Sequence, residues 1–169
     1  KLNWYSVNSV DTNACPGLVQ NGSTVYVIGG RGPGGRSAIK LDGKKDAGEL
    51  KSLWSTTGGS YVSSPVLTKD HLFWFTERGM GICVDAKTGK EVTRKRIGGE
   101  FYASAILIKD KIYAVSRFSG THVFSATPEM TELAHNKLTD QSDFSGSPAV
   151  SDGQFIMRSD KYLYCIETE

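Results

Sequence analysis

Apolar residues in this chain come in short runs separated by polar turns, and no stretch keeps the spacing of an amphipathic helix. Segment 61–99 shows the pattern best. It contains an apolar pair at 66–67, an aromatic-rich run at 72–75, a third apolar run at 82–84 and a charged segment at 91–97. A turn at 85–90 joins the last two, and its Gly89 supplies the positive φ that tight turns require. We therefore predict four short antiparallel strands in this segment.

The same pattern recurs along the chain. Aligning it on Pro65, Ala105 and Pro148 places the units at intervals of about 40 residues. A serine stands one residue before each of these positions and an aromatic residue four before: Ser64, Ser104 and Ser147, with Tyr61, Phe101 and Phe144. Four strands in about forty residues, repeated, are typical of a β-propeller blade. We predict an all-β fold, a β-propeller of four-stranded antiparallel blades with about four blade-equivalents.

The repeat also predicts the domain organisation. Residues 1–169 form a single propeller domain or propeller fragment, with units at about 14–56, 61–99, 101–141 and 144–169. Pro16 is taken as the anchor of the first unit. Trp4 then precedes Pro16 much as Trp54 precedes Pro65, which predicts a spare outer strand at 1–7. Because the last unit has three strands, three arrangements remain open: a fragment of a larger ring, a closed four-bladed ring, and half of an eight-bladed ring completed by a homodimer.

Charge and hydropathy narrow the choice of partners. The chain has 20 basic and 18 acidic residues, a net charge of +2, so no strong field attracts nucleic acid or a membrane surface. Its longest apolar runs have the length of strands, so we expect no membrane insertion. We therefore expect no nucleic-acid partner.

Two local patterns suggest binding but have simpler interpretations. The glycine-rich stretch 30–35 resembles a phosphate-binding loop, but a strand-like segment follows it and Pro33 removes a backbone donor, which favours a long turn. The basic cluster 94–96 could contact an acidic partner. It falls in an outer strand, where charges prevent edge-to-edge pairing, and that interpretation is favoured.

The cysteines and histidines show no catalytic or metal-binding pattern. Cys83 and Cys165 share one repeat position and are expected to be buried thiols, while Cys15 stands apart. No cysteine spacing matches a zinc site, and a disulfide between blades is not expected. The three histidines share no motif and are interpreted as structural or solvated: His71, His122 and His135. We assign no catalytic residue and no metal ligand. The recurring aromatic residues are expected to pack between blades.

The motifs resemble one known repeat. The run S-S-P-V-L, an aromatic strand and then C-V-D-A-K-T-G-K-E is similar to the pyrroloquinoline-quinone (PQQ) type propeller repeat. That family's repeat ends in D-x-x-T-G followed by a tryptophan that docks between neighbouring blades. The resemblance implies repeat-structural roles for Ser64, Pro65, Asp85, Thr88, Gly89, Trp54 and Trp4. The repeat is degenerate elsewhere: Thr93 stands near the tryptophan position of the second unit, Ser125 and Glu167 replace the aspartate, and an irregular turn follows Asp42.

The resemblance implies several functions. Some members are dehydrogenases that bind PQQ and a calcium ion on the propeller axis, whereas others are scaffolds for membrane-protein assembly or extracytoplasmic sensor domains. The dehydrogenases have six to eight blades, and this chain supplies about half of that number. We therefore expect a non-enzymatic scaffold that holds a protein partner, in the periplasm or outside the cell, with no cofactor. The alternatives are part of a PQQ-dependent oxidoreductase, with PQQ and calcium, and a sensor domain of a signalling protein.

Overall fold

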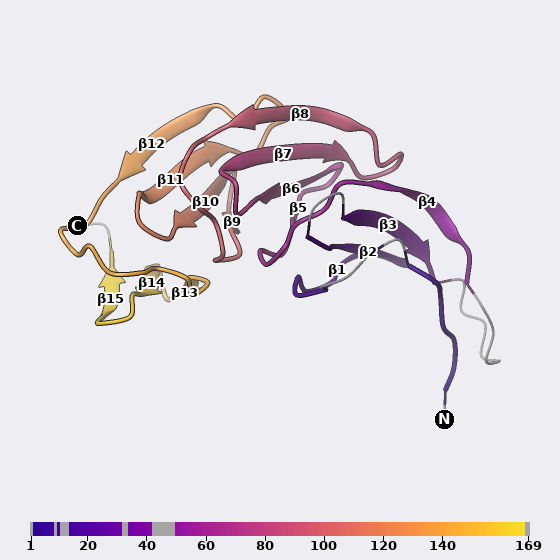
Figure 1. The fold of residues 1–169 in the computed structure, drawn as a ribbon, viewed down its shortest axis with the longest axis horizontal. Helices are drawn as coiled ribbons and strands as arrows, with labels where there is room; N and C mark the ends of the chain where they lie inside the picture. Colours follow the sequence, from indigo (N-terminus) through magenta and orange to yellow (C-terminus); the bar gives the residue numbers. More distant parts are fainter. Residues whose placement is uncertain (1, 9, 11–13, 32–33, 42–49, 168–169) are drawn as a thin grey trace.

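The fold is all-β, as the sequence predicts. The computed structural model describes the chain except for residues 1, 9, 11–13, 32–33, 42–49 and 168–169. The described residues form four antiparallel sheets, arranged side by side in an arc (Figure 1). No helix among them is long and apolar enough to cross a membrane.

Each sheet is a simple meander in which strands pair in sequence order. The first sheet contains β1 (Val19–Asn21), β2 (Thr24–Gly29), β3 (Gly35–Lys40) and β4 (Ser52–Thr57). The second contains β5 (Val66–Leu67), β6 (His71–Phe75), β7 (Met80–Asp85) and β8 (Glu91–Arg96). The third contains β9 (Ile106–Ile108), β10 (Lys111–Ser116), β11 (Gly120–Ser125) and β12 (Glu132–Asn136). The fourth has three strands, β13 (Ala149–Ser151), β14 (Gln154–Arg158) and β15 (Leu163–Ile166). The first strand of every sheet lies on the concave side of the arc (Figure 1).

The core lies between neighbouring sheets, and the middle strands are buried on both faces. In β6, Phe73 and Phe75 pack in the cluster shared with the third sheet, which also contains Phe101, Ile112 and Phe124. The alternate residues Leu72 and Trp74 pack in the cluster shared with the first sheet. A smaller cluster joins the third and fourth sheets. A strand buried on both faces needs apolar residues at successive positions, which explains the uninterrupted apolar run at 72–75.

A row of hydrogen bonds joins neighbouring units on the concave side. The backbone N–H of Gly17 donates to Ser64 Oγ at 2.8 Å. The N–H of Ser64 donates to Ser104 Oγ at 2.9 Å, and that of Ser104 to Ser147 Oγ at 2.9 Å. The serine that recurs in the sequence therefore links each unit to the one before it. We call this row the serine seam.

Strand register corrects the alignment of the first unit. Val19 pairs with Tyr26 just as Val66 pairs with Phe73, so Gly17 takes the position of Ser64 and Leu18 that of Pro65. Pro16 is therefore not the equivalent of Pro65. Likewise, Lys40 pairs with Thr24 as Asp85 pairs with His71, so Lys40 occupies the aspartate position. Asp42, to which the sequence pattern points, lies outside the described residues.

The predicted outer strand at 1–7 is not formed in the described residues 2–8. Tyr5 makes an isolated bridge, and its carbonyl accepts a hydrogen bond of 2.8 Å from the N–H of Leu50. This segment runs beside the first sheet, at the other end of the arc from β13–β15 (Figure 1). Trp4 therefore does not complete the fourth sheet and does not occupy a position equivalent to that of Trp54.

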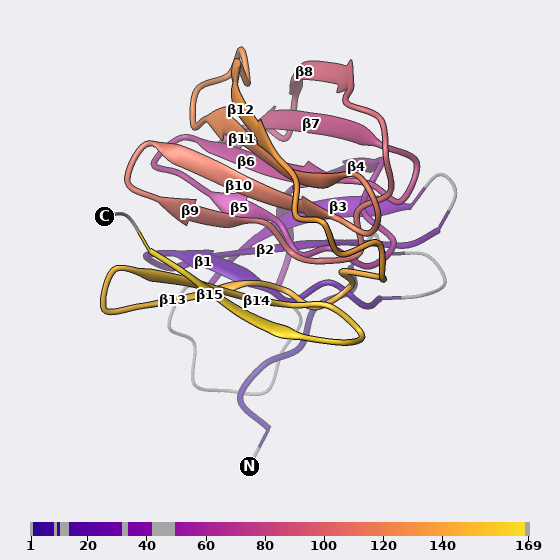
Figure 2. The same ribbon diagram turned by 90° about the vertical axis from the view of Figure 1, so that its left-hand side faces the viewer.

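The fourth sheet has a neighbour on one face among the described residues. Figure 2 looks onto its other side. Leu163 of β15, on the face opposite Tyr164 and the shared cluster, is 75% exposed. The expectation of two buried cysteines is consequently half right. Cys83 is buried, and burial raises its pKa to about 12, whereas Cys165 at the equivalent position is exposed. The missing cover on the outward face accounts for the difference.

The serine seam makes a prediction about stability. The substitution Ser104→Ala removes the acceptor of the Ser64 N–H, and we expect it to lower the free energy of unfolding by about 1 kcal/mol. Urea denaturation monitored by tryptophan fluorescence measures this change. The control is Ser151→Ala, because the Ser151 hydroxyl is exposed and bonds to the neighbouring Asp152; we expect a change within about 0.5 kcal/mol. Equal effects of the two substitutions would contradict a stabilising role for the seam.

Candidate functional site

The strongest candidate for a binding site is a cluster of aromatic and arginine side chains on the loops at one end of the sheets. Tyr61 and Tyr102 lie in the segments that enter β5 and β9, and Arg117 and Phe118 form the turn between β10 and β11. Arg31 follows β2. In an antiparallel meander, these entering segments and turns fall at the same end of the sheets. We call these five residues the aromatic–arginine surface.

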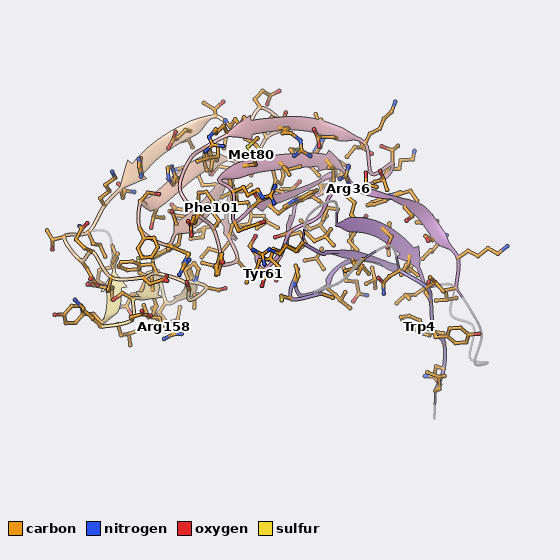
Figure 3. All side chains as sticks on the ribbon, viewed as in Figure 1. Trp4, Arg36, Tyr61, Met80, Phe101 and Arg158 are labelled. Atoms are coloured by element: carbon orange, nitrogen blue, oxygen red, sulfur yellow. The ribbon has the colours of Figure 1, made fainter. Side chains whose placement is uncertain are left out.

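The members of this surface stack on one another. The Arg117 guanidinium lies over the Tyr102 ring, 4.5 Å from its centroid, and 5.0 Å from that of Phe118. Tyr102 meets Tyr61 edge to face with centroids 6.3 Å apart, and Arg31 lies 5.2 Å from the centroid of Tyr61. Figure 3 places Tyr61 on the concave side of the arc. The stack therefore extends across loops of the first, second and third units.

Ion pairs fix Arg117 in this position. Its Nη1 lies 3.0 Å from a carboxylate oxygen of Glu100, and its Nε donates to Asp143 Oδ2 at 2.9 Å. Burial alone would raise the pKa of Asp143, but hydrogen bonds from Arg117 and Ser145 outweigh that effect and lower the pKa. Asp143 is thus held ionised beside the guanidinium. The arginine is oriented before any ligand arrives, which reduces the entropy lost on binding.

Such a surface is suited to a protein partner. Tyrosine, tryptophan and arginine dominate the residues that carry binding energy in protein interfaces. Phe118 is 60% exposed although it lies against a fixed cation, so an apolar contact is available beside a charged group. The three recurring aromatic residues differ in burial. Phe101 and Phe144 are buried between sheets, as expected, while Tyr61 is partly exposed and belongs to the aromatic–arginine surface.

The residues assigned to the repeat lie in two places. Trp54, Asp85, Thr88 and Gly89 meet at the contact between the first and second sheets. Trp54 Nε1 donates to the carbonyl of Ala86 at 3.0 Å, and its ring lies against Gly89.

The turn at Asp85 is held by side-chain hydrogen bonds. Asp85 Oδ1 accepts hydrogen bonds of 2.7 Å from both the N–H and the hydroxyl of Thr88, which lower the pKa of Asp85. Ser64 lies in the serine seam, and Pro65 is buried next to it. Trp4 lies at the N-terminal end of the arc, well away from the labelled Tyr61 (Figure 3).

The inner strands offer no charged side chain to a quinone with calcium. Calcium is bound by several oxygen ligands, usually with carboxylates among them. The inner strands β1, β5, β9 and β13 carry the sequences VQN, VL, ILI and AVS, which contain no carboxylate and no basic residue. Within the described part of the chain, these strands therefore supply neither the ligands for the ion nor the cations for an acidic quinone.

One group of side chains was missed by sequence reasoning. The potential ligand atoms of His122, Glu132 and His135 all lie within 4.8 Å of one another. His122 is buried in β11, and the other two lie on β12. Neither the spacing nor a motif indicates this group, because cross-strand pairing between β11 and β12 brings it together. The aromatic–arginine surface was missed for a similar reason, since its members come from different units.

Comparison with known proteins supports a relationship to PQQ-like propellers. No protein-family model matches the chain. It is 30% identical over 114 residues to outer membrane protein assembly factor BamB of Burkholderia pseudomallei (strain K96243). That alignment covers 66% of this chain and 29% of the relative, so the chain matches under a third of that protein's length.

Solved structures confirm the propeller architecture. BamB from Moraxella catarrhalis superposes with a TM-score of 0.70 and 15% identity, covering 90% of this chain and 46% of that one. Quinohemoprotein alcohol dehydrogenase from Comamonas testosteroni superposes with a TM-score of 0.67 and 13% identity, covering 93% of this chain and 30% of that one. At these identities the superpositions bear on fold alone.

The contact between Trp54 and Gly89 makes a second prediction. Gly89 has φ of +70°, and a Cβ there would lie 2.6 Å from Trp54 Cε3. We expect Gly89→Ala to lower the free energy of unfolding by about 3 kcal/mol, through backbone strain and displacement of the indole. Thermal and urea denaturation measure the change.

A matched glycine separates the two causes. Gly98 also has positive φ, +92°, but a Cβ there would meet nothing within 4 Å. We expect Gly98→Ala to cost about 1 kcal/mol, from backbone strain alone. If Gly89→Ala were no more destabilising than Gly98→Ala, the contact with Trp54 would not hold the two sheets together.

Proposed function

We propose that this chain is a non-enzymatic binding or scaffold module that holds a protein partner on its aromatic–arginine surface, in the periplasm or outside the cell. The observation that carries the proposal is the fixed stack of Arg117, Tyr102 and Phe118. The similarity to a protein named as an outer membrane protein assembly factor supports it. By that similarity, the partner belongs to the machinery that assembles membrane proteins.

The charge of the surface favours a protein over a nucleic acid. A nucleic-acid site is dominated by uncompensated Lys and Arg, because phosphate contacts supply most of the affinity. Here the positive charge of Arg117 is matched by Glu100 and Asp143. What remains for a ligand is an aromatic surface with fixed charges around it, and protein interfaces have this composition.

The proposal is tested in two steps, beginning with identification of the partner. A photo-crosslinking amino acid is placed at Phe118 in the protein expressed in its native cells, and at Leu133 as a control. Both side chains are apolar and exposed, but Leu133 lies on the outer strand β12. We expect a defined protein to be crosslinked at 118 and not at 133.

In the second step, affinity for the purified partner is measured with substituted chains. We expect Phe118→Ser and Arg117→Ala each to weaken binding by at least tenfold, as central interface residues do. The control is Arg94→Ala, because Arg94 lies on the outer strand β8 and its ion pair is with Glu91 of the same strand. Because Phe118 is exposed, Phe118→Ser is expected to keep the fold even if Arg117→Ala does not. Binding that is unchanged in Phe118→Ser, or equally weakened in Arg94→Ala, would contradict the proposal.

The quinoprotein alternative has its own test. We expect that titration of the protein with PQQ and excess calcium, followed by absorbance and by equilibrium dialysis, gives no saturable uptake. The physical reason is the absence of acidic and basic side chains from the inner strands of the four sheets. Saturable one-to-one uptake that requires calcium would contradict the expectation and favour the oxidoreductase.

A further inference from the structure

The arrangement of His122, Glu132 and His135 depends on a bulge in β12. His122 pairs with His135 across the strands, and Phe124 pairs with Glu132, so Leu133 is the extra residue. Residues three apart in a regular strand point to opposite faces. The bulge cancels one step of that alternation. It places Glu132 and His135 on one face of the sheet, the face that also carries His122 on the neighbouring strand.

The second sheet shows what this geometry does with other side chains. It has the same irregularity between Cys83 and Val84, and there Ile82 pairs with Arg94 while Val84 pairs with Glu91. Arg94 and Glu91 form an ion pair of 2.6 Å, at the positions that His135 and Glu132 occupy in the third sheet. The bulge thus brings two side chains of the outer strand into contact. In the third sheet all three positions carry residues that bind metals.

His122 has a ring nitrogen without a partner. Its side chain is buried, with the residue 4% exposed, and lies between Phe101 and Phe124. Nδ1 lies 2.8 Å from a carboxylate oxygen of Glu132, but Nε2 has no hydrogen-bond partner within the described structure. A buried polar atom without a partner is uncommon and destabilising, so hydrogen bonds do not fully satisfy this ring in its present position.

One ring nitrogen of His135 is held by a backbone carbonyl, as is common for metal-binding histidines. Its ring stacks on that of His122 with centroids 3.9 Å apart, so one of the two rings must turn before both point their lone pairs at one ion. Its Nε2 lies 2.6 Å from the carbonyl of Ser119, so this nitrogen carries the proton and donates. Nδ1 is left with its lone pair. Metal-binding histidines commonly donate their second ring N–H to a backbone carbonyl, which fixes the tautomer in this way.

We propose that His122, Glu132 and His135 bind a divalent transition-metal ion of the zinc class. Two imidazoles and one carboxylate form a common set of three protein ligands for zinc, with a fourth position left for water or for a ligand from another molecule. Glu132 and His135 are exposed, so an ion enters from solvent. Two ligands of one zinc ion lie about 3–3.5 Å apart, so side-chain rotations close the 4.8 Å group around the ion.

The site also lies close to the aromatic–arginine surface. Ser119, which accepts the hydrogen bond from His135, follows Phe118 in the β10–β11 turn. An ion on His135 would therefore fix the turn that carries Phe118. The metal proposal stands on the geometry of β11 and β12 and does not depend on the proposed function.

Titration with zinc chloride tests the site. The untagged, metal-free chain is titrated by calorimetry and equilibrium dialysis, and histidine ring NMR signals are followed. We expect one ion per chain, with shifts of the His122 and His135 rings and none of His71. We expect His135→Gln and Glu132→Gln each to weaken zinc binding at least tenfold. Both residues are exposed, so the variants keep the fold.

Two controls exclude other sites. Glu91→Gln alters the corresponding carboxylate of the second sheet, where Ile82 and Arg94 stand at the positions of the two histidines, and we expect it to bind zinc like the unmodified chain. Cys15→Ser with Cys165→Ser removes the two exposed thiols, and we expect unchanged binding. The proposal is overturned if no ion binds at 100-fold molar excess, if His135→Gln binds zinc as well as the unmodified chain, or if the cysteine substitutions abolish binding.

Discussion

Every sheet in this molecule depends on its neighbours to cover its apolar faces. The strands of the second sheet show the constraint most fully, because Trp74 packs toward the first sheet and Phe75 toward the third. A fully buried aromatic side chain stabilises the fold by about 1.5–3 kcal/mol, and each of these two stays buried only while the sheet that it faces is in place. Stability is therefore shared between units, as in other repeat proteins. The fourth sheet lacks a neighbour on one side among the described residues, and Leu163 and Cys165, which face that side, are exposed as a consequence.

Polar contacts set the spacing that this packing requires. The serine seam joins the units on the concave side, and Trp54 joins the first two sheets further out. Because the seam and the packed faces hold neighbouring units together, the loops between the units keep their positions relative to one another. Arg117 can then bridge Glu100 and Asp143 from neighbouring loops. The rigid stack of sheets thus provides a preorganised surface, which is what a scaffold needs in order to bind a partner without a large loss of entropy.

Much of the fold could be predicted from the sequence because strands and turns leave recurring local patterns of apolar, glycine and serine residues. The apolar run at 72–75, the turn at Gly89 and the serine one residue before each anchor position all correspond to features of the structure. The sequence pattern misaligns the first unit because Pro16, like Pro65, stands shortly before an apolar pair. The strand register is instead set by the turn at Asn21 and Gly22. Cys165 shares a repeat position with Cys83, but burial depends on a neighbouring sheet and no local pattern reports it.

Less of the candidate sites could be predicted, since both depend on non-local geometry. The aromatic–arginine surface joins loops from three units, and its members share no spacing. The group at His122 requires a bulge at Leu133, without which Glu132 would point away from His135. A bulge of this kind follows from the pairing of two strands, and the sequence of one strand alone does not signal it.

Hydrogen–deuterium exchange, measured amide by amide, tests most directly whether stability is shared between neighbouring sheets. We expect the slowest exchange in β6, β7, β10 and β11, which have a sheet on either side. We expect β14 and β15 to exchange fastest among the paired strands, because one face of their sheet is uncovered. Equal protection in all four sheets, or greatest protection in β14 and β15, would contradict the account, because each sheet would then be stable without its neighbours.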